Sequence, residues 1–179
     1  TGICGFRFLN LTETFMYGVN FQNTTTSANG YLDYWSDVTN DLYGFQLGGR
    51  GHYRLGSSGR WGVHLATNVG IYGNDIEVWQ RMDSPTGSVR FIQTAENFNV
   101  RASKTDVSMI GEVRAGLSYL FSDDCRFYAG WRAVGITGVA LANDQAPAAF
   151  IDAAQLAGYV NSSGSMIVHG LRTGFEWNY

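Results

Sequence analysis

Arginine, glutamate and histidine side chains recur at alternate positions in several stretches of this sequence. In LYGFQLGGRGHYRL, residues 42–55, Arg50, His52 and Arg54 are spaced by two. Residues with this spacing lie on one face of a β-strand, where their charges could form salt bridges or favour anions. Arg7 and Glu13 are expected on the same face. If the strands close into a barrel, this charged face is predicted to point inward and line the lumen. The predicted lumen-lining residues are Arg50, His52, Arg54, His64, Glu112, Arg114, Arg132, Arg172 and Glu176.

Nothing in the sequence adds catalytic chemistry to these charges. A serine hydrolase needs a serine, a histidine and an acid that converge, and no GxSxG elbow is present. The GGRG stretch, residues 48–51, lies inside a predicted strand and lacks the helix that a phosphate loop opens. His52 and His64 are predicted on paired strands and are interpreted as hydrogen-bonded residues, with pore lining or ligand binding as the alternatives. We therefore expect no enzyme, no cofactor and no metal site.

The opposite face of the same stretches is apolar. In WGVHLATNVGIYGN, residues 61–74, Val63, Leu65 and Val69 alternate with glycine, histidine and asparagine. Comparable stretches recur along the chain and predict six two-faced antiparallel strands. The alternation shifts phase near Phe8 and Leu9, which predicts a β-bulge in the first strand. It is lost again near Gly135.

The predicted connections between strands alternate in length. Only GSSG, residues 56–59, and SDDC, residues 122–125, separate two of the strand pairs. The remaining gaps, at 22–41, 74–106 and 142–165, are long and polar and are predicted to be loops. Short turns at one end and long loops at the other are typical of bacterial outer-membrane barrels. Within the loops, DSPTG at 83–87 suggests a hairpin, and Pro147 could open a short helix.

Composition agrees with a barrel and excludes other classes. The chain has 179 residues, 23 of them glycine, and only 15% are charged. No apolar run approaches the ~20 residues of a membrane helix, and a net charge of −3 with dispersed arginines argues against nucleic acid. We predict one domain, an all-β, antiparallel, up-and-down transmembrane β-barrel with its apolar face toward lipid. The alternatives are a soluble lipocalin-like ligand-binding barrel, whose apolar face lines the interior, and a subunit of an extracellular assembly.

Aromatic residues gather near the short turns and at the end of the sequence. Such residues form girdles at the membrane interface of barrels. If the short turns face the periplasm, the rings all lie at one interface. The predicted girdle consists of Tyr53, Trp61, Tyr119, Phe121, Phe127, Trp177 and Tyr179.

Two cysteines permit a single disulfide. Cys4 begins the first predicted strand and Cys125 closes a short turn, so both are expected at the periplasmic end. The periplasm is oxidising, and a bond is possible if the Cα atoms lie within ~7 Å. Two free thiols are the alternative.

Six strands are fewer than a closed barrel needs. Single-chain outer-membrane barrels start at about eight strands, and open edges in lipid leave backbone groups unpaired. We therefore predict that residues 1–179 are the C-terminal part of a larger barrel, completed by strands outside this sequence. Extra strands from the 74–106 segment or neighbouring chains that share one barrel are the alternatives.

Several short motifs carry a family resemblance. GFRFLNLTE, GGRGHYRLG, GEVRAGLSYLF, GITGVALANDQ and HGLRTGFEW together resemble a planctomycete outer-membrane β-barrel porin family, the seventh such β-barrel porin family, from Gly5 to Tyr179. The resemblance implies the outer membrane of the cell envelope, with a porin-like pore or a surface scaffold as function. Phe175, Trp177 and Tyr179 resemble the C-terminal signal that barrel-assembly machinery recognises. The implied partners are outer-membrane lipid and that machinery, and a homo-oligomer is left open.

Overall fold

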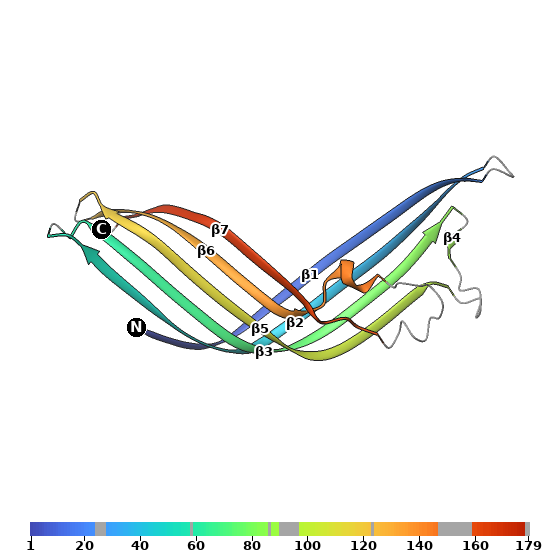
Figure 1. Ribbon diagram of the computed structural model, residues 1–179, viewed down its shortest axis with the longest axis horizontal. Coiled ribbons are helices and arrows are strands. Elements are labelled where there is room, and N and C mark those ends of the chain that lie inside the picture. The colour runs from blue at the N-terminus through green and yellow to red at the C-terminus, as the bar shows by residue number, and fades with distance from the viewer. Residues whose placement is uncertain are drawn as a thin grey trace.

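A single antiparallel sheet, curled into a half-barrel, makes up most of the protein (Figure 1). The computed structural model describes residues 1–23, 28–57, 59–85, 87–89, 97–122, 124–146 and 159–177. Its elements are β1 (Gly2–Asn23), β2 (Ala28–Leu55), β3 (Trp61–Ser84), β4 (Gly87–Ser88), β5 (Asn99–Leu120), β6 (Cys125–Val139), the 3-10 helix η1 (Ala142–Gln145) and β7 (Gly164–Trp177).

The long strands pair in the order β1-β2-β3-β5-β6-β7, and β4 adds a short pair to the end of β3. The predicted all-β antiparallel up-and-down order is therefore confirmed. β1 and β7 are the two edges of the sheet, and no backbone pairing joins them within the described residues. None of the helices in this part of the chain is long and apolar enough to cross a bilayer.

The strands run far beyond the predicted ends. β2 alone has 28 residues, or about 90 Å at ~3.3 Å per residue. Its ladder with β1 continues without a shift from Gly2↔Gly49 to Asn23↔Ala28. The prediction of a loop over residues 22–41 was therefore wrong for most of that range.

The 74–106 range is also largely strand. β3 continues to Ser84, β5 begins at Asn99, and the two pair up to Arg81↔Asn99. The turn predicted at DSPTG is present, since Ser84 pairs with Gly87. The 142–165 range holds η1 and ends in the first residues of β7, and the helix predicted from Pro147 lies outside the described residues.

The bulge lies in a different strand from the predicted one. No register shift interrupts the pairing of β1 with β2, so the phase shift at Phe8 and Leu9 has another cause. Leu9 and Leu11 face the opposite side of the sheet from Phe6 and Phe8, and there they pack against a buried cluster. The only register shift among the described pairs falls between Thr137 and Val139, where Gly138 has a φ of 78°.

A contact between distant strands identifies the concave face. Arg7 of β1 forms an ion pair with Glu112 of β5, at 3.2 Å, although β2 and β3 lie between these strands in the sheet. Side chains on non-neighbouring strands meet only on the inner side of a curled sheet. Register then assigns every other residue of each strand to the concave face and the rest to the convex face.

The concave face is filled in the half of the sheet that is remote from the short turns. Two apolar clusters lie there, one centred on Val38, Ile76 and Val78 and the other on Tyr34 and Met82. Ala140 and Ala142, which follow β6, belong to the first cluster, so this segment folds inward over the sheet. A third cluster, built around Leu42, Tyr72, Ile110, Ile136 and Val139, lies between these two and the short-turn half.

Candidate functional site

The convex face is apolar in the half of the sheet that ends in the short turns. Leu47 of β2 pairs with Val69 of β3, and most large side chains of this region are exposed on the same side. We call this surface the convex apolar band. Among the described residues its exposed large side chains are Phe6, Phe8, Tyr43, Phe45, Leu47, Tyr53, Leu55, Trp61, Leu65, Val69, Ile71, Val107, Met109, Val113, Leu117, Trp131, Ile167, Leu171, Phe175 and Trp177.

The band stops at the same register position on four neighbouring strands. Its last row consists of Phe8, Tyr43, Gly73 and Val107. The next row consists of Asn10, Asp41, Asp75 and Thr105. In this polar row Asn10 donates a hydrogen bond to Asp41 at 2.7 Å, and Thr105 donates one to Asp75 at 2.8 Å. Beyond it the convex face carries further charges, among them Asp37, Glu77 and Arg101.

On these four strands the convex and concave faces therefore exchange polarity at this row. On β3, the convex side has Val69 and Ile71 before the row and Glu77 after it. The concave side has His64 before the row and the buried Ile76 after it. The half near the short turns is apolar outside and polar inside, and the other half has the reverse arrangement.

Aromatic rings contact one another at the short-turn end of the band. The ring centroids of Trp61 and Tyr119 lie 4.7 Å apart, those of Tyr119 and Phe121 5.0 Å, and those of Phe127 and Phe175 5.2 Å. Phe175 is a member that the predicted girdle omitted, although its phase with Trp177 could have revealed it. Tyr53 and Trp177 are exposed on the same face, and Tyr179 lies outside the described residues.

The predicted lumen-lining residues all lie on the concave face by register. At their centre is Glu112, whose side chain is 2% exposed. It accepts hydrogen bonds from Arg7 Nη1 at 3.2 Å and from Arg114 Nε, and Arg132 Nε lies 2.8 Å from the same carboxylate. A buried carboxylate is stable only with such partners, so the three guanidinium groups hold its charge in place.

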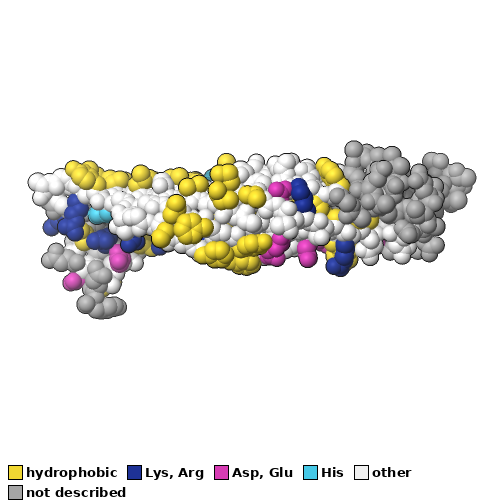
Figure 2. All heavy atoms as spheres, turned by 90° about the horizontal axis from the view of Figure 1, so that it is seen from below, with side chains coloured by type: hydrophobic (Ala, Val, Ile, Leu, Met, Phe, Trp, Pro, Cys, Tyr) yellow, Lys and Arg dark blue, Asp and Glu magenta, His cyan; other side chains and the backbone are white. Residues whose placement is uncertain are grey.

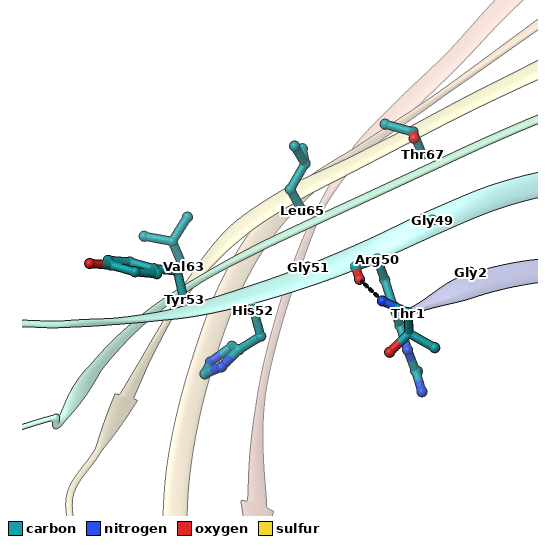
Figure 3. Close-up of a pocket in the computed structure, with 10 residues that line it drawn as sticks. All are labelled: Thr1, Gly2, Gly49, Arg50, Gly51, His52, Tyr53, Val63, Leu65 and Thr67. Atoms are coloured by element: carbon teal, nitrogen blue, oxygen red, sulfur yellow. Dashed lines mark hydrogen bonds between the residues drawn. The ribbon is translucent and has the colours of Figure 1, made fainter.

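A hollow of about 600 Å³ opens beside Glu112 toward the short turns. Figure 2 shows basic side chains and histidine gathered at this end of the molecule. Arg50 and His52 point to the opposite side of the sheet from Val63 and Leu65, while the Thr1 amino group donates to the Arg50 carbonyl at 2.9 Å (Figure 3). The basic residues that line the hollow are Arg50, His52, His64, Arg114, Arg126, Arg132 and Arg172.

Two further contacts arrange the arginines of the hollow. Arg126 lies 3.5 Å from Glu176, and Arg172 lies over the ring of Tyr128 at 5.3 Å. Arg126 was not among the predicted lumen-lining residues, although its even spacing from Arg132 places both on one face. Arg54 is next to this region, near the turn between β2 and β3.

On the side of the hollow remote from the short turns, the segment that follows β6 covers the concave face. The side-chain amide of Asn40 donates to the Ala140 carbonyl and its oxygen accepts from the Ala140 N–H, both at 2.9 Å. Asn74 donates to Asn40 and to the Gly138 carbonyl. Glu13, which was expected among the inward charges, accepts from the Ala142 N–H at 2.9 Å.

An ion pair on β5 binds the residues that precede β7. Lys104 Nζ lies 2.7 Å from Asp106 Oδ2, and Ser162 donates to the same oxygen. The Lys104 ammonium, the Ser162 hydroxyl and the Val107 N–H stabilise the carboxylate and hold the pKa of Asp106 well below its usual range. Asp106 is therefore ionised at every pH at which proteins normally work.

The two cysteines are both free. Register connects Cys4 to Leu47, Val69, Gly111 and Gly135 across the sheet. Cys4 is therefore level with the middle of β6, and the prediction that it lies at the short-turn end was wrong. Gly135 is separated from Cys125 by about 33 Å of strand, at ~3.3 Å per residue. A bond would need Cα atoms within ~7 Å.

Comparisons with known proteins identified no relative of this chain. No family model, no curated protein and no solved structure matches the chain. The resemblance to a planctomycete porin family therefore stays a prediction.

Proposed function

We propose that this chain belongs to a bacterial outer-membrane β-barrel protein, with lipid covering the convex apolar band. The observation that carries the proposal is the exchange of polarity at one register row on four neighbouring strands. A water-soluble sheet has no reason to keep charge off one half of its outer face and place it on the other half. A bilayer that covers only the first half supplies that reason.

The length of the band supports lipid as the covering material. On β3 the band runs from Trp61 to Gly73, about 40 Å along the strand at ~3.3 Å per residue. Strands in barrels tilt by about 35–45°, so this length rises by roughly 30 Å. That rise agrees with the thickness of a hydrocarbon core, about 30 Å. The aromatic cluster at its end is placed like an interfacial girdle.

Within the outer-membrane class, a surface scaffold is favoured over an open pore. The long strands continue past the band, where their inner face is packed with buried apolar residues such as Val38, Ile76 and Met82. The inward segment from Gly138 to Gln145 occupies the concave face at the boundary. These groups fill the space that a water-filled channel would need within this half-barrel.

The two alternatives predict different surfaces. A lipocalin-like barrel requires the apolar face of residues 43–55 and 61–73 to line the interior, whereas this face is convex and exposed. An extracellular assembly would cover the band with protein instead of lipid, and the structure of one chain is equally compatible with that covering.

Fractionation of cells that produce the protein tests the proposal. We expect the protein to sediment with the outer membrane and to be released only by detergent, with a mobility on detergent gels that changes on heating. Release by high salt or alkaline carbonate without detergent would contradict the membrane proposal. A soluble particle of many copies would instead support the assembly.

A further inference from the structure

We propose that the hollow beside Glu112 binds a water-soluble polyanion that carries phosphate or carboxylate groups. Four strands contribute arginines to it: β2, β5, β6 and β7. Its volume of about 600 Å³ is enough for a small molecule with several anionic groups. The inference goes beyond the proposed function, because it depends only on the concave face and not on what covers the convex one.

The charge of the hollow is strongly positive. Its lining includes Arg50, Arg114, Arg126, Arg132 and Arg172 and contains no aspartate or glutamate. The nearest carboxylates among the described residues are Glu112 and Glu176, and the first of these already pairs with Arg7 as well. One buried carboxylate therefore serves three guanidinium groups, and the positive charge that remains is directed toward the hollow.

Four of the five arginines in the hollow have a contact that positions the guanidinium group, namely Arg114, Arg126, Arg132 and Arg172. Arg114 and Arg132 both bind Glu112 through Nε. Glu112 is the only carboxylate that pairs with either of them in the described part of the chain, and it is shared with Arg7. Arg172 lies over Tyr128 and has no carboxylate partner in that part of the chain. Planar guanidinium donors that are fixed in advance bind phosphate and carboxylate oxygens well, because little conformational entropy is lost on binding.

Glycines keep the hollow open. The ring of His64 lies against Gly116 and Gly130, and a Cβ atom at Gly116 would overlap it. A Cβ at Gly130 would lie 3.2 Å from His64 Nε2. Because these positions have no side chain, the imidazole lies close to the sheet and leaves the space in front of the arginines free. Its ring nitrogens add a further hydrogen-bonding group to the wall of the hollow.

The ligand would enter from the short-turn end. The opposite direction is blocked by the inward segment and by the buried cluster around Leu42, Tyr72 and Ile136. If the short turns face the periplasm, as the sequence leads us to expect, the ligand is a periplasmic solute.

Calorimetric titration of the purified full-length protein in detergent with pyrophosphate tests the site. We expect saturable binding that weakens as salt concentration rises. Arg172→Gln should weaken binding by about tenfold, since one charge-assisted partner is lost. Arg172→Lys keeps the charge but loses the planar guanidinium group, so its affinity for pyrophosphate should lie between those of the wild type and Arg172→Gln. Arg101→Gln, on the convex face of β5, is the matched control and should bind like the wild type.

The results distinguish a failure of the anion site from a failure of the proposed membrane location. Arg50→Gln repeats the test from another strand if Arg172→Gln does not fold, as judged by circular dichroism. The proposal is overturned if the wild type shows no binding at millimolar pyrophosphate, or if Arg172→Gln and Arg50→Gln bind as tightly as Arg101→Gln. A protein that binds pyrophosphate but leaves the membrane without detergent would contradict only the proposed membrane location.

Discussion

At the scale of single residues, three arginines of the concave face share one carboxylate, that of Glu112. Glu112 is buried and contacts Arg7, Arg114 and Arg132, which are 25%, 43% and 46% exposed. The arginines can still reach water, whereas the carboxylate cannot. The loss of Glu112 would therefore leave three positive groups close together with nothing between them.

Substitution of Glu112 by glutamine tests this dependence. We expect Glu112→Gln to lower the free energy of unfolding by about 2–3 kcal/mol, somewhat below the cost of breaking a fully buried ion pair because the arginines are partly exposed. Chemical denaturation in detergent measures the change. Glu77→Gln, on the exposed convex face of β3, is the control and should stay within about 0.5 kcal/mol of the wild type. Equal effects of the two substitutions would show that Glu112 does not organise the arginines.

The Asp106 ion pair predicts a pH dependence. The pKa of Asp106 is lowered in the folded protein from an ordinary value of 3.8, with Lys104 as the first cause. A lowered folded pKa adds stability that is complete above the unfolded value and is lost as pH falls through the folded one. Thermal unfolding of the wild type should therefore show this contribution unchanged from neutral pH down to about pH 5. It should decline below pH 3.8.

The variant Asp106→Asn isolates this contribution. It lacks the carboxylate, so the difference in melting temperature between wild type and variant should shrink as pH falls below 3.8. A difference that is constant across this range would mean that Asp106 titrates normally.

At the scale of the strand, one continuous element changes polarity along its convex face. β3 presents Val63, Leu65 and Val69 on its convex side near the short turns, and Asp75 and Glu77 on the same side farther along. The backbone ladder is unbroken across the change. Under the proposed membrane location, the two parts of the convex face differ in the medium that they contact, lipid in one half and water in the other. Matched substitutions on one strand can test this.

Val69→Arg and Glu77→Arg form such a pair. Both lie on the convex face of β3, and Val69 is 55% exposed in the isolated chain. An arginine near the middle of a bilayer costs about 2–4 kcal/mol. Val69→Arg should therefore reduce the amount of folded, heat-resistant protein in outer-membrane fractions, while Glu77→Arg leaves it unchanged. If Val69→Arg accumulates as well as Glu77→Arg, this part of the strand faces water.

The inward segment gives a second prediction at the scale of elements. Asn40 is fully buried and satisfies both the N–H and the carbonyl of Ala140. Asn40→Leu removes both partners and should lower the free energy of unfolding by about 2–4 kcal/mol, since each unpaired buried group costs about 1–3 kcal/mol. The adjacent Thr39→Val, on the convex side, is the control for chemical denaturation. A loss no larger than that of Thr39→Val would show that Asn40 does not anchor the segment.

At the scale of the whole molecule, the two edges of the sheet are the main open feature. β1 pairs with β2 and β7 pairs with β6, and the backbone groups on the outer side of each edge strand pair with no other described strand. In lipid each unmet group costs several kcal/mol. We therefore expect both edges to pair with further strands, either from outside residues 1–179 or from neighbouring copies. Because β1 and β7 run in opposite directions, either source can continue the antiparallel order.

Native mass spectrometry from detergent micelles tests the closure. The folded species should be heavier than one copy of residues 1–179, as an oligomer or as a longer polypeptide. A heat-resistant monomer formed by these residues alone would contradict the prediction, since it would have closed a barrel with six long strands.

The sequence by itself determined two of the strand pairs and, in the half near the short turns, which residues share a face. Alternation in residues 43–55 and 61–73 is local and has a period of two, so it identifies a strand and divides its residues between two sides. The short turns at 56–59 and 122–125 then fix which strands are neighbours. The inward placement of Arg50, His64 and Glu112 needed a third step, the interpretation as a membrane barrel, because a lipocalin-like barrel would have reversed the two faces.

Only the tertiary structure decided where each strand ends and what its faces contact. Residues 30–41, 74–84 and 99–106, which were interpreted as parts of loops, keep a period of two, but their outer face is largely polar and their inner face is largely buried. Which face of an alternating stretch is the buried one depends on what lies across from it, and that partner is far away in sequence. Arg7 meets Glu112, and Asn40 meets Ala140. The curl of the sheet brings these partners together, and no local pattern encodes it.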